Sequence, residues 1–442
     1  MHPQAILTAI LVVTLLLQAA VPRMRLVIVN AGAALACLAT SLLGLATTGT
    51  LLAEVPWDVL VILVGLGLLS EMMAESRLFG LLAVASTRLS RANPRKVLLA
   101  FCVGMYAVSG LVNNLTALIL VLPILHILLQ LMSVDQRYTS WCLGALLVAC
   151  NLGGAATPIG DFPAILLLGR GSMDFTAYLS LALPTTLVAL VILLLLVLYV
   201  VRPDRTLGHG EASSRLSVAV MSALYRNTRL DWRVLAPSAV MLAVMLVGWT
   251  VLPRESGMTP ELICWLGVGT ALLLRPSLGE VLMRRRVDVE AALFLLALFV
   301  MVGAVRRSGM FKDVAAMLAE LPAPPLAQLL VFLVLAGILT GLFSAGPSMA
   351  ALLDVAESLA QRMDGPAVYV GLALSVCAGS SLFLTAATSG PMAQALTERA
   401  ELKDHRGQPL AFGFFHFLPV GMVGFSVILL VGIAFALWRV GF

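Results

Sequence analysis

The sequence NLGGAATPIGDFP, residues 151–163, interrupts an apolar segment that is otherwise long enough to cross a bilayer. Three glycines and two prolines lie within these thirteen residues. Proline removes a backbone donor, and its ring blocks the preceding helical turn. A helix broken here leaves amide and carbonyl groups free to bind an ion or an anion. The stretch therefore predicts a broken membrane helix, with Asp161 as an acid inside the break.

The chain around this interruption has the composition of a membrane protein. Hydrophobic residues make up 60% and charged residues 12% of the 442 residues, and the mean hydropathy is +1.02. Soluble domains carry about 25% charged residues. Apolar stretches of about 17–25 residues recur from end to end, and each can cross the bilayer as a helix. We therefore expect an all-α, multi-pass protein in the lipid bilayer of a bacterial-type inner membrane.

Ten of these stretches are expected to be transmembrane spans. They cover residues 5–21, 26–47, 57–76, 141–168 and 177–201 in the first half, and residues 233–252, 261–275, 289–305, 366–396 and 411–438 in the second half.

Two further apolar segments, 97–130 and 326–360, are expected to be re-entrant hairpins. Each is interrupted near its centre, by the polar residues 112–115 in the first and by residues 344–347 in the second. Each arm then has about 15 residues and reaches about 22 Å at 1.5 Å per residue, which is too short for a full crossing.

Lysine and arginine gather in the loops on one side of this arrangement, among them 77–96 and 275–286. The positive-inside rule makes this side cytoplasmic, so both termini are expected outside. The polar stretch 202–232 would be a cytoplasmic linker between a first repeat, 1–201, and a second repeat, 233–442. Because the arginines lie in short loops and not on one basic face, nucleic acid is not an expected partner.

The two halves repeat each other without gaps around the third span. Asp58 corresponds to Glu290, and Ser76 corresponds to Ser308, each 232 residues further on. In the charge-based topology the Asp58 helix runs inward and the Glu290 helix runs outward, so the repeats are inverted. Inverted repeats with broken helices are a transporter plan in which the binding site lies near the midplane of the bilayer.

The interruptions supply the candidate site residues. Side-chain amides and hydroxyls at the first tip offer neutral oxygen ligands, although asparagine also satisfies stray backbone groups in such turns. In the second half, small residues can also serve close helix packing. The candidate substrate-binding and ion-binding residues are Ser109, Asn113, Asn114 and Thr116 at the first tip, Asn151, Gly153, Thr157 and Asp161 in the first broken span, Ser344 and Ser348 at the second tip, and Ser380, Ser381, Thr385 and Thr388 in the second broken span.

Asp161 is the most central acid of this topology, and an acid at membrane depth is a functional-site hypothesis by default. Its carboxyl can hold a proton or, once ionised, a cation, so proton coupling is assigned to it, with Na⁺ expected at Asn113, Asn114 and Asp161. The alternative is a carboxylate that only caps the following half-helix. Asp354 and Glu357 lie two to three turns beyond the second tip, where we expect solvated positions.

The chain resembles the ion-transporter superfamily, which covers D-type sodium/proton antiporters, arsenite-efflux permeases and dicarboxylate symporters. The resemblance rests on VSGLVNNLT at 108–116, the run ending IGDFP at 159–163, MDF at 173–175, VDVE at 287–290 and FHFLP at 415–419.

This resemblance implies an elevator-type transporter and probable ligands only at matching positions. It implies a scaffold domain, here the helices of 5–76 and 233–305, which forms a homodimer, and a transport domain that carries the site. It also implies that Asn113, Asn114 and Thr116 bind the coupling ion or substrate. Phe162 stands where the family usually has proline, and the second tip lacks its usual asparagine.

Ion-coupled secondary transport is the function that these patterns favour, with sodium/proton exchange first because Asp161 is present. Efflux of arsenite or another small oxyanion or metalloid, and sodium-coupled carboxylate uptake, remain alternatives, and a channel is a remote one. The ligand is then a small inorganic ion or a small anionic solute. An enzyme is not expected, since no HExxH or GxSxG motif occurs. No cofactor is expected beyond Na⁺ or H⁺ as the coupling ion.

Overall fold

The computed structural model describes residues 3–21, 24–90, 93–202, 230–252, 257–320, 322–387, 389–404 and 406–441. Apart from an isolated bridge between Lys403 and Pro409, the regular structure of these residues is helical. Nine helices are long and apolar enough to cross a membrane, and a tenth span is formed if α14 and α15, bent by 120°, are counted together. The expectation of an all-α multi-pass membrane protein is confirmed.

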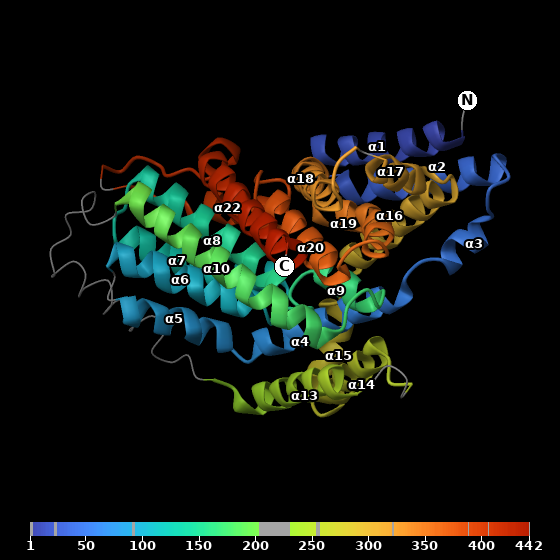
Figure 1. Ribbon diagram of the computed structural model, residues 1–442. Coiled ribbons are helices and arrows are strands. Elements are labelled where there is room, and N and C mark those ends of the chain that lie inside the picture. The colour runs from blue at the N-terminus through green and yellow to red at the C-terminus, as the bar shows by residue number, and fades with distance from the viewer. Residues whose placement is uncertain are drawn as a thin grey trace.

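The helices follow the expected order in both halves (Figure 1). In the first half they are α1 (Pro3–Ala20), α2 (Arg25–Leu42), α3 (Thr48–Ala53), α4 (Trp57–Glu75), α5 (Leu78–Ser90), α6 (Pro94–Ser109), α7 (Asn114–Leu131), α8 (Gln136–Ala156), α9 (Phe162–Gly169) and α10 (Phe175–Val201). In the second half they are α13 (Trp232–Val251), α14 (Pro260–Leu273), α15 (Pro276–Arg285), α16 (Val289–Arg307), α17 (Met310–Ala319), α18 (Pro325–Phe343), α19 (Ala345–Ala360), α20 (Gly365–Ser380), α21 (Ser389–Ala400) and α22 (Phe414–Gly441).

Four short helices were not expected. The basic stretches 77–96 and 275–286, interpreted as loops, contain α5 and α15, and α3 and α17 follow α2 and α16. Each has between 6 and 13 residues, so none reaches the length on which a search for membrane spans depends. The linker 202–232 lies for the most part outside the described residues.

The two halves exchange their third spans. Helix α4 packs against α13 and α14 of the second half, while α16 packs against α1 and α2 of the first half. Figure 1 shows α1 and α2 along one edge of the molecule and α13 and α14 along the opposite edge. We call α1–α4 together with α13–α16 the scaffold group. Its two halves are interlocked, because each contributes one helix to the other.

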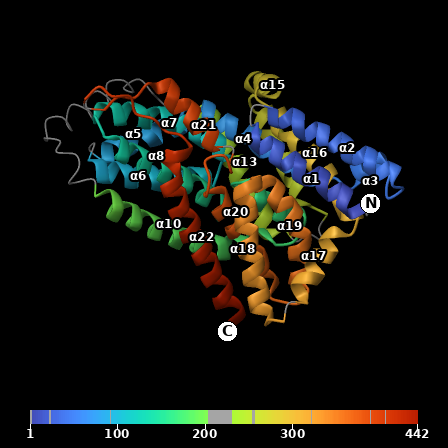
Figure 2. The ribbon, with the colours of Figure 1, turned by 90° about the horizontal axis from the view of Figure 1, so that it is seen from above.

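Ion pairs at both ends show that α4 and α16 run in opposite directions. Arg286, just before α16, approaches Glu71 and Glu75 near the C-terminal end of α4 at 3.8 Å. At the other end, Arg307 of α16 pairs with Glu54, just before α4. The helices α5 and α17 begin 232 residues apart, and Figures 1 and 2 place them at opposite ends of the molecule. An inverted repeat requires this arrangement.

The remaining helices bring both hairpin tips to the middle of the molecule. Helices α6 and α8 pack together, as do α18 and α20, and α10 and α22 join the two pairs. After each break the chain crosses to the other half, since α9 contacts α19 and α21 contacts α7. We call α5–α10 together with α17–α22 the hairpin group. Its centre is where the two breaks and the two tips meet.

Candidate functional site

The predicted break separates α8 from α9. Helix α8 ends at Ala156 and α9 begins at Phe162. Asp161 is the N-cap of α9, because its Oδ1 accepts a hydrogen bond of 2.8 Å from the backbone N–H of Phe162. Thr157 donates from Oγ1 to the carbonyl of Gly110 at 2.6 Å. The break is therefore tied to the first hairpin tip at one end and capped by its own acid at the other.

The first tip is held by side-chain hydrogen bonds. Ser109 donates from Oγ to the carbonyl of Cys150 at 2.6 Å and also to Oδ1 of Asn114. Asn113 caps α7 by accepting from the backbone N–H of Leu115 at 2.8 Å. Asn113 thus satisfies a backbone group, as the alternative interpretation proposed, whereas Asn114 is buried and turned toward α8.

A glycine allows Asn114 and Asp161 to come together. A Cβ atom on Gly154 would lie 2.8 Å from both Oδ1 and Nδ2 of Asn114 and 2.9 Å from Cβ of Asp161. Any larger residue would push the two side chains apart. At the neighbouring Gly153 a Cβ would overlap the carbonyl of Tyr106, so this glycine serves the close packing of α8 on α6.

A cavity of about 140 Å³ lies where the breaks and tips meet. From the first half it is lined by Asn113, Asn114 and Asp161, and from the second half by Ser344 and Ser389. The two tips and the predicted acid, separated by up to 276 positions in the chain, therefore share one space.

The scaffold group closes one side of this cavity. Arg25, Asp288 and Phe294 belong to the lining, and Asp288 caps α16 by accepting from the N–H of Ala291 at 2.9 Å. The guanidinium of Arg25 lies 5.6 Å from the ring centre of Phe294. With Asp161 and Asp288 against Arg25, the charged lining residues carry one more negative than positive charge.

A second, much smaller cavity of about 10 Å³ lies behind Asp161. Asn151, Asp161, Tyr178 and Ser380 are among its lining residues. The amide of Asn151 donates to the carbonyl of Ser380 at 3.3 Å and to Oγ of Ser381 at 3.1 Å. Its Oδ1 is buried and has no hydrogen-bond partner among the described residues. A space of this size holds one water molecule or a small cation.

The other predicted residues lie around these two cavities. Thr116 hydrogen-bonds to Glu71 at 3.4 Å in an adjoining cavity of about 250 Å³, which extends to Arg286. Ser348 is buried beneath the second tip, and its Oγ has no partner among the described residues. Thr385 is exposed and lines neither cavity, while Thr388 lies outside the described residues.

Three lining residues were not predicted. Arg25 was counted as an ordinary basic loop residue, because charge counting takes no account of its place at the start of α2. Asp288 lies in the VDVE motif at the start of α16, so its motif was noticed but its position beside the cavity was not. Ser389 begins α21 next to a predicted threonine. Only packing between the halves reveals these positions.

Comparison with known proteins identifies relatives along most of the chain. A family model described as "Citrate transporter" (CitMHS) matches residues 6–379. The magnetosome protein MamN of Magnetospirillum gryphiswaldense is 27% identical over 83% of this chain and 82% of that protein. An uncharacterized transporter of Mycobacterium tuberculosis is 25% identical over 81% of each chain. The crystal structure of the YdaH transporter of Alcanivorax borkumensis matches with a TM-score of 0.55 and 17% identity, covering 99% of this chain and 98% of that one, so the two share a fold.

Proposed function

Since this chain belongs to the citrate transporter family of secondary transporters, we propose that it exchanges Na⁺ for H⁺ by alternating access, with Asp161 as the group that the two ions share. The observation that carries this proposal is the position of Asp161. It lies in a helix break, between two cavities, in contact with the hairpin tip that bears Asn114.

The chemistry of the site fits a small cation. The cap to α9 uses Oδ1 of Asp161, so the second carboxylate oxygen is available to bind a proton or Na⁺. The two ions compete because protonation removes the negative charge that holds the cation. Asn114 and the unpartnered Oδ1 of Asn151 offer neutral oxygen atoms nearby. Within the described residues no cluster of three His, Cys, Asp or Glu side chains forms, which suits Na⁺ better than a transition metal.

Uptake of a carboxylate such as citrate is the second candidate. It is favoured by the family name and by the helix ends at the large cavity, where α7, α9, α16, α19 and α21 all present first-turn or capping residues. Helix N-termini attract anions, and Arg25 adds one positive charge. Against it, Asp161 and Asp288 make the lining acidic overall.

Elevator motion, dimerisation and orientation are parts of the same proposal. We propose that the scaffold group stays fixed and mediates a homodimer, while the hairpin group carries the site between the two sides. The direction of α4 and α16 and the basic loops support an orientation with both termini outside. On this basis the cavity described here, which adjoins Arg286, is open to the cytoplasm.

The test is flux through purified protein in proteoliposomes. With a pH gradient imposed, addition of Na⁺ is expected to dissipate the gradient and to drive uphill Na⁺ movement, whereas citrate or arsenite is not. Uphill citrate movement coupled to either ion would replace sodium/proton exchange with the second candidate. Movement only down each solute's own gradient would indicate a channel.

Two asparagine substitutions separate the charge of Asp161 from its capping role. Asp161→Asn keeps a good N-cap but removes the charge, and it is expected to abolish exchange. Asp135→Asn is the matched control, because Asp135 caps α8 by accepting from the N–H of Tyr138 at 2.8 Å and lies outside the cavities. Full exchange by Asp161→Asn, with unchanged dependence on pH and Na⁺, would contradict the proposal.

A further inference from the structure

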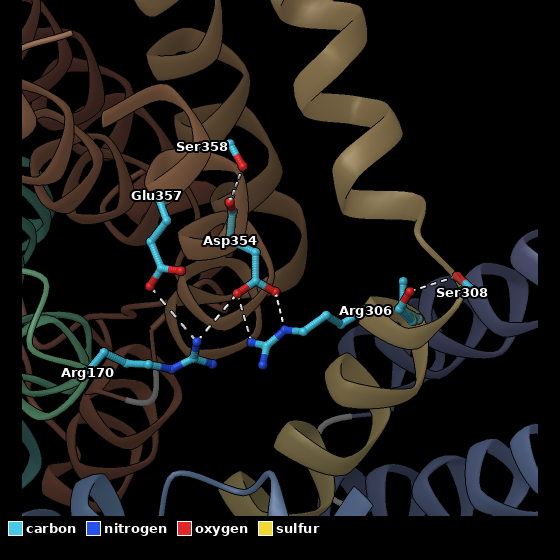
Figure 3. Close-up of polar contacts among 7 residues, drawn as sticks. Arg170, Arg306, Ser308, Asp354, Glu357 and Ser358 are labelled. Atoms are coloured by element: carbon cyan, nitrogen blue, oxygen red, sulfur yellow. Dashed lines mark hydrogen bonds and ion pairs between the residues drawn. The ribbon is translucent and has the colours of Figure 1, made fainter. Parts of the chain in front are cut away.

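A cluster of four charged residues joins the second hairpin to the scaffold group (Figure 3). Arg306 of α16 forms a two-pronged pair with Asp354 of α19, with distances of 2.7 Å from Nε to Oδ2 and from Nη2 to Oδ1. Arg170, which caps the C-terminus of α9, approaches the same Oδ1 at 3.4 Å and Glu357 at 4.0 Å. Figure 3 shows the two guanidinium groups reaching Asp354 from opposite sides.

These residues are not the solvated rim that the sequence predicted. Only 13% of the Asp354 side chain is exposed, against 18% for Arg170 and 32% for Arg306. Ion pairs in such partly buried places are screened less by salt than exposed pairs. Removal of one partner leaves a poorly hydrated charge behind. The contact therefore carries enough energy to influence how the hairpin sits.

The cluster lies at the opposite end of α16 from the candidate site's opening. Helix α16 begins beside Arg286 and Asp288, where the large cavity adjoins the cytoplasmic opening. It ends at Arg306 and Arg307 after 19 residues, about 27 Å away at 1.5 Å per residue. The molecule is thus open toward Arg286 while α19 is tied to the scaffold group at the Arg306 end.

We propose that Arg306, Asp354 and Arg170 form a latch that closes the Arg306 side in this conformation and must separate when access alternates. This inference rests on the proposed alternating access. In the other conformation the three charges become hydrated, because α19 moves away from α16. The latch then sets the balance between the two conformations, since it is formed in only one of them.

The test measures access to the second tip from the Arg306 side. Gly346→Cys is a suitable reporter, because a Cβ there meets only side-chain atoms of Leu295 and Phe162 at 3.7 and 3.8 Å. The full chain, with its native cysteines replaced, is treated in membranes with an impermeant maleimide added from that side. Asp354→Asn is expected to raise the labelling rate about tenfold, which is the population change produced by about 1.4 kcal/mol.

A matched control comes from a similar pair elsewhere. Arg439 forms a two-pronged pair with Asp364 at 3.0 and 3.2 Å, but both residues belong to the hairpin group. Asp364→Asn is therefore expected to leave the labelling rate unchanged. Arg306→Gln is expected to act like Asp354→Asn, and the double variant is expected to add nothing further, because both changes break one contact. Arg306→Lys, which keeps the charge but loses the fork, is expected to fall between.

The outcomes separate the latch from the function on which it rests. Unchanged labelling in Asp354→Asn and Arg306→Gln would overturn the latch. If Asp354→Asn does not fold, Arg306→Lys decides in the same way. Raised labelling together with a failed Na⁺ flux assay would leave the latch standing and remove only the ion assignment. Equal increases in Asp364→Asn and Asp354→Asn would show general loosening and would also overturn it.

Discussion

The two hairpins occupy corresponding places in the two halves, but different forces hold them. In the first hairpin, α7 packs on α5 with Leu122 and Leu125, which are at most 1% exposed. The residues 232 positions later, Asp354 and Glu357, lie on α19 and face arginines beside a cavity of about 270 Å³. Apolar packing holds one hairpin, and ion pairs hold the other.

The tips differ in the same sense. The first tip is fixed by Ser109, which donates to Asn114 and to the carbonyl of Cys150. At the second tip Ser344 makes no capping hydrogen bond and has φ of +78°, and Ser348 has no partner within the described part of the chain. The comparison teaches that the first hairpin is built as a fixed half of the site, whereas the second is built to let go.

The largest effect is expected from truncating the apolar contact of the first hairpin. Leu125→Ala should lower the free energy of unfolding by about 2–5 kcal/mol, because it leaves a cavity in the core. Glu357→Ala, at the corresponding place of the second hairpin, should change it by no more than about 0.5 kcal/mol. Thermal unfolding in detergent compares the two. Equal losses would show that both hairpins are held alike.

An intermediate effect is expected at the first tip. Ser109→Ala should cost about 1–3 kcal/mol, because Asn114 and the Cys150 carbonyl lose a buried donor, and it should weaken Na⁺ dependence of exchange. The counterpart Thr340→Val removes a hydroxyl that bonds only to the carbonyl of Ala336 in its own helix at 2.7 Å. Its exchange should stay close to that of the unsubstituted protein. A stronger defect in Thr340→Val would reverse the assignment of the fixed tip.

The smallest effect is expected at Ser344. Its φ of +78° and ψ of 158° lie in a region that is favourable only for glycine. Ser344→Gly should therefore raise the free energy of unfolding by about 1 kcal/mol. Ala345→Gly, in the first turn of α19, should lower it slightly. A loss of stability in Ser344→Gly would mean that its hydroxyl contributes more than the backbone conformation costs.

Much of this fold could be predicted from local sequence. Glycine and proline within 151–163 act on their own backbone, so the break and the place of Asp161 inside it were predictable. The hairpin interruptions and the register of 232 residues follow from the same kind of local evidence. The helix α5 could not be found in this way, because a 13-residue helix is too short to meet a span criterion and too basic to attract notice.

The site was predictable only in part, because its geometry comes from the exchange between halves. Asn114 and Asp161 belong to interruptions of one half and were both predicted. Arg25 and Asp288 reach the cavity because α2 and α16 pack together across the halves, and no local pattern reports such a contact. Asp354 was placed at a solvated rim for the same reason, since its partners Arg170 and Arg306 come from other helices.

The central claim is that both hairpin tips open into one cavity beside Asp161. Its most direct test is labelling of Asn113→Cys and Gly346→Cys with an impermeant thiol reagent, in intact cells and in inverted membrane vesicles. In the unsubstituted latch background, both positions are expected to react mainly from the side that carries Arg286. Reaction of the two positions from opposite sides of the bilayer, each at a freely exposed surface, would contradict the account.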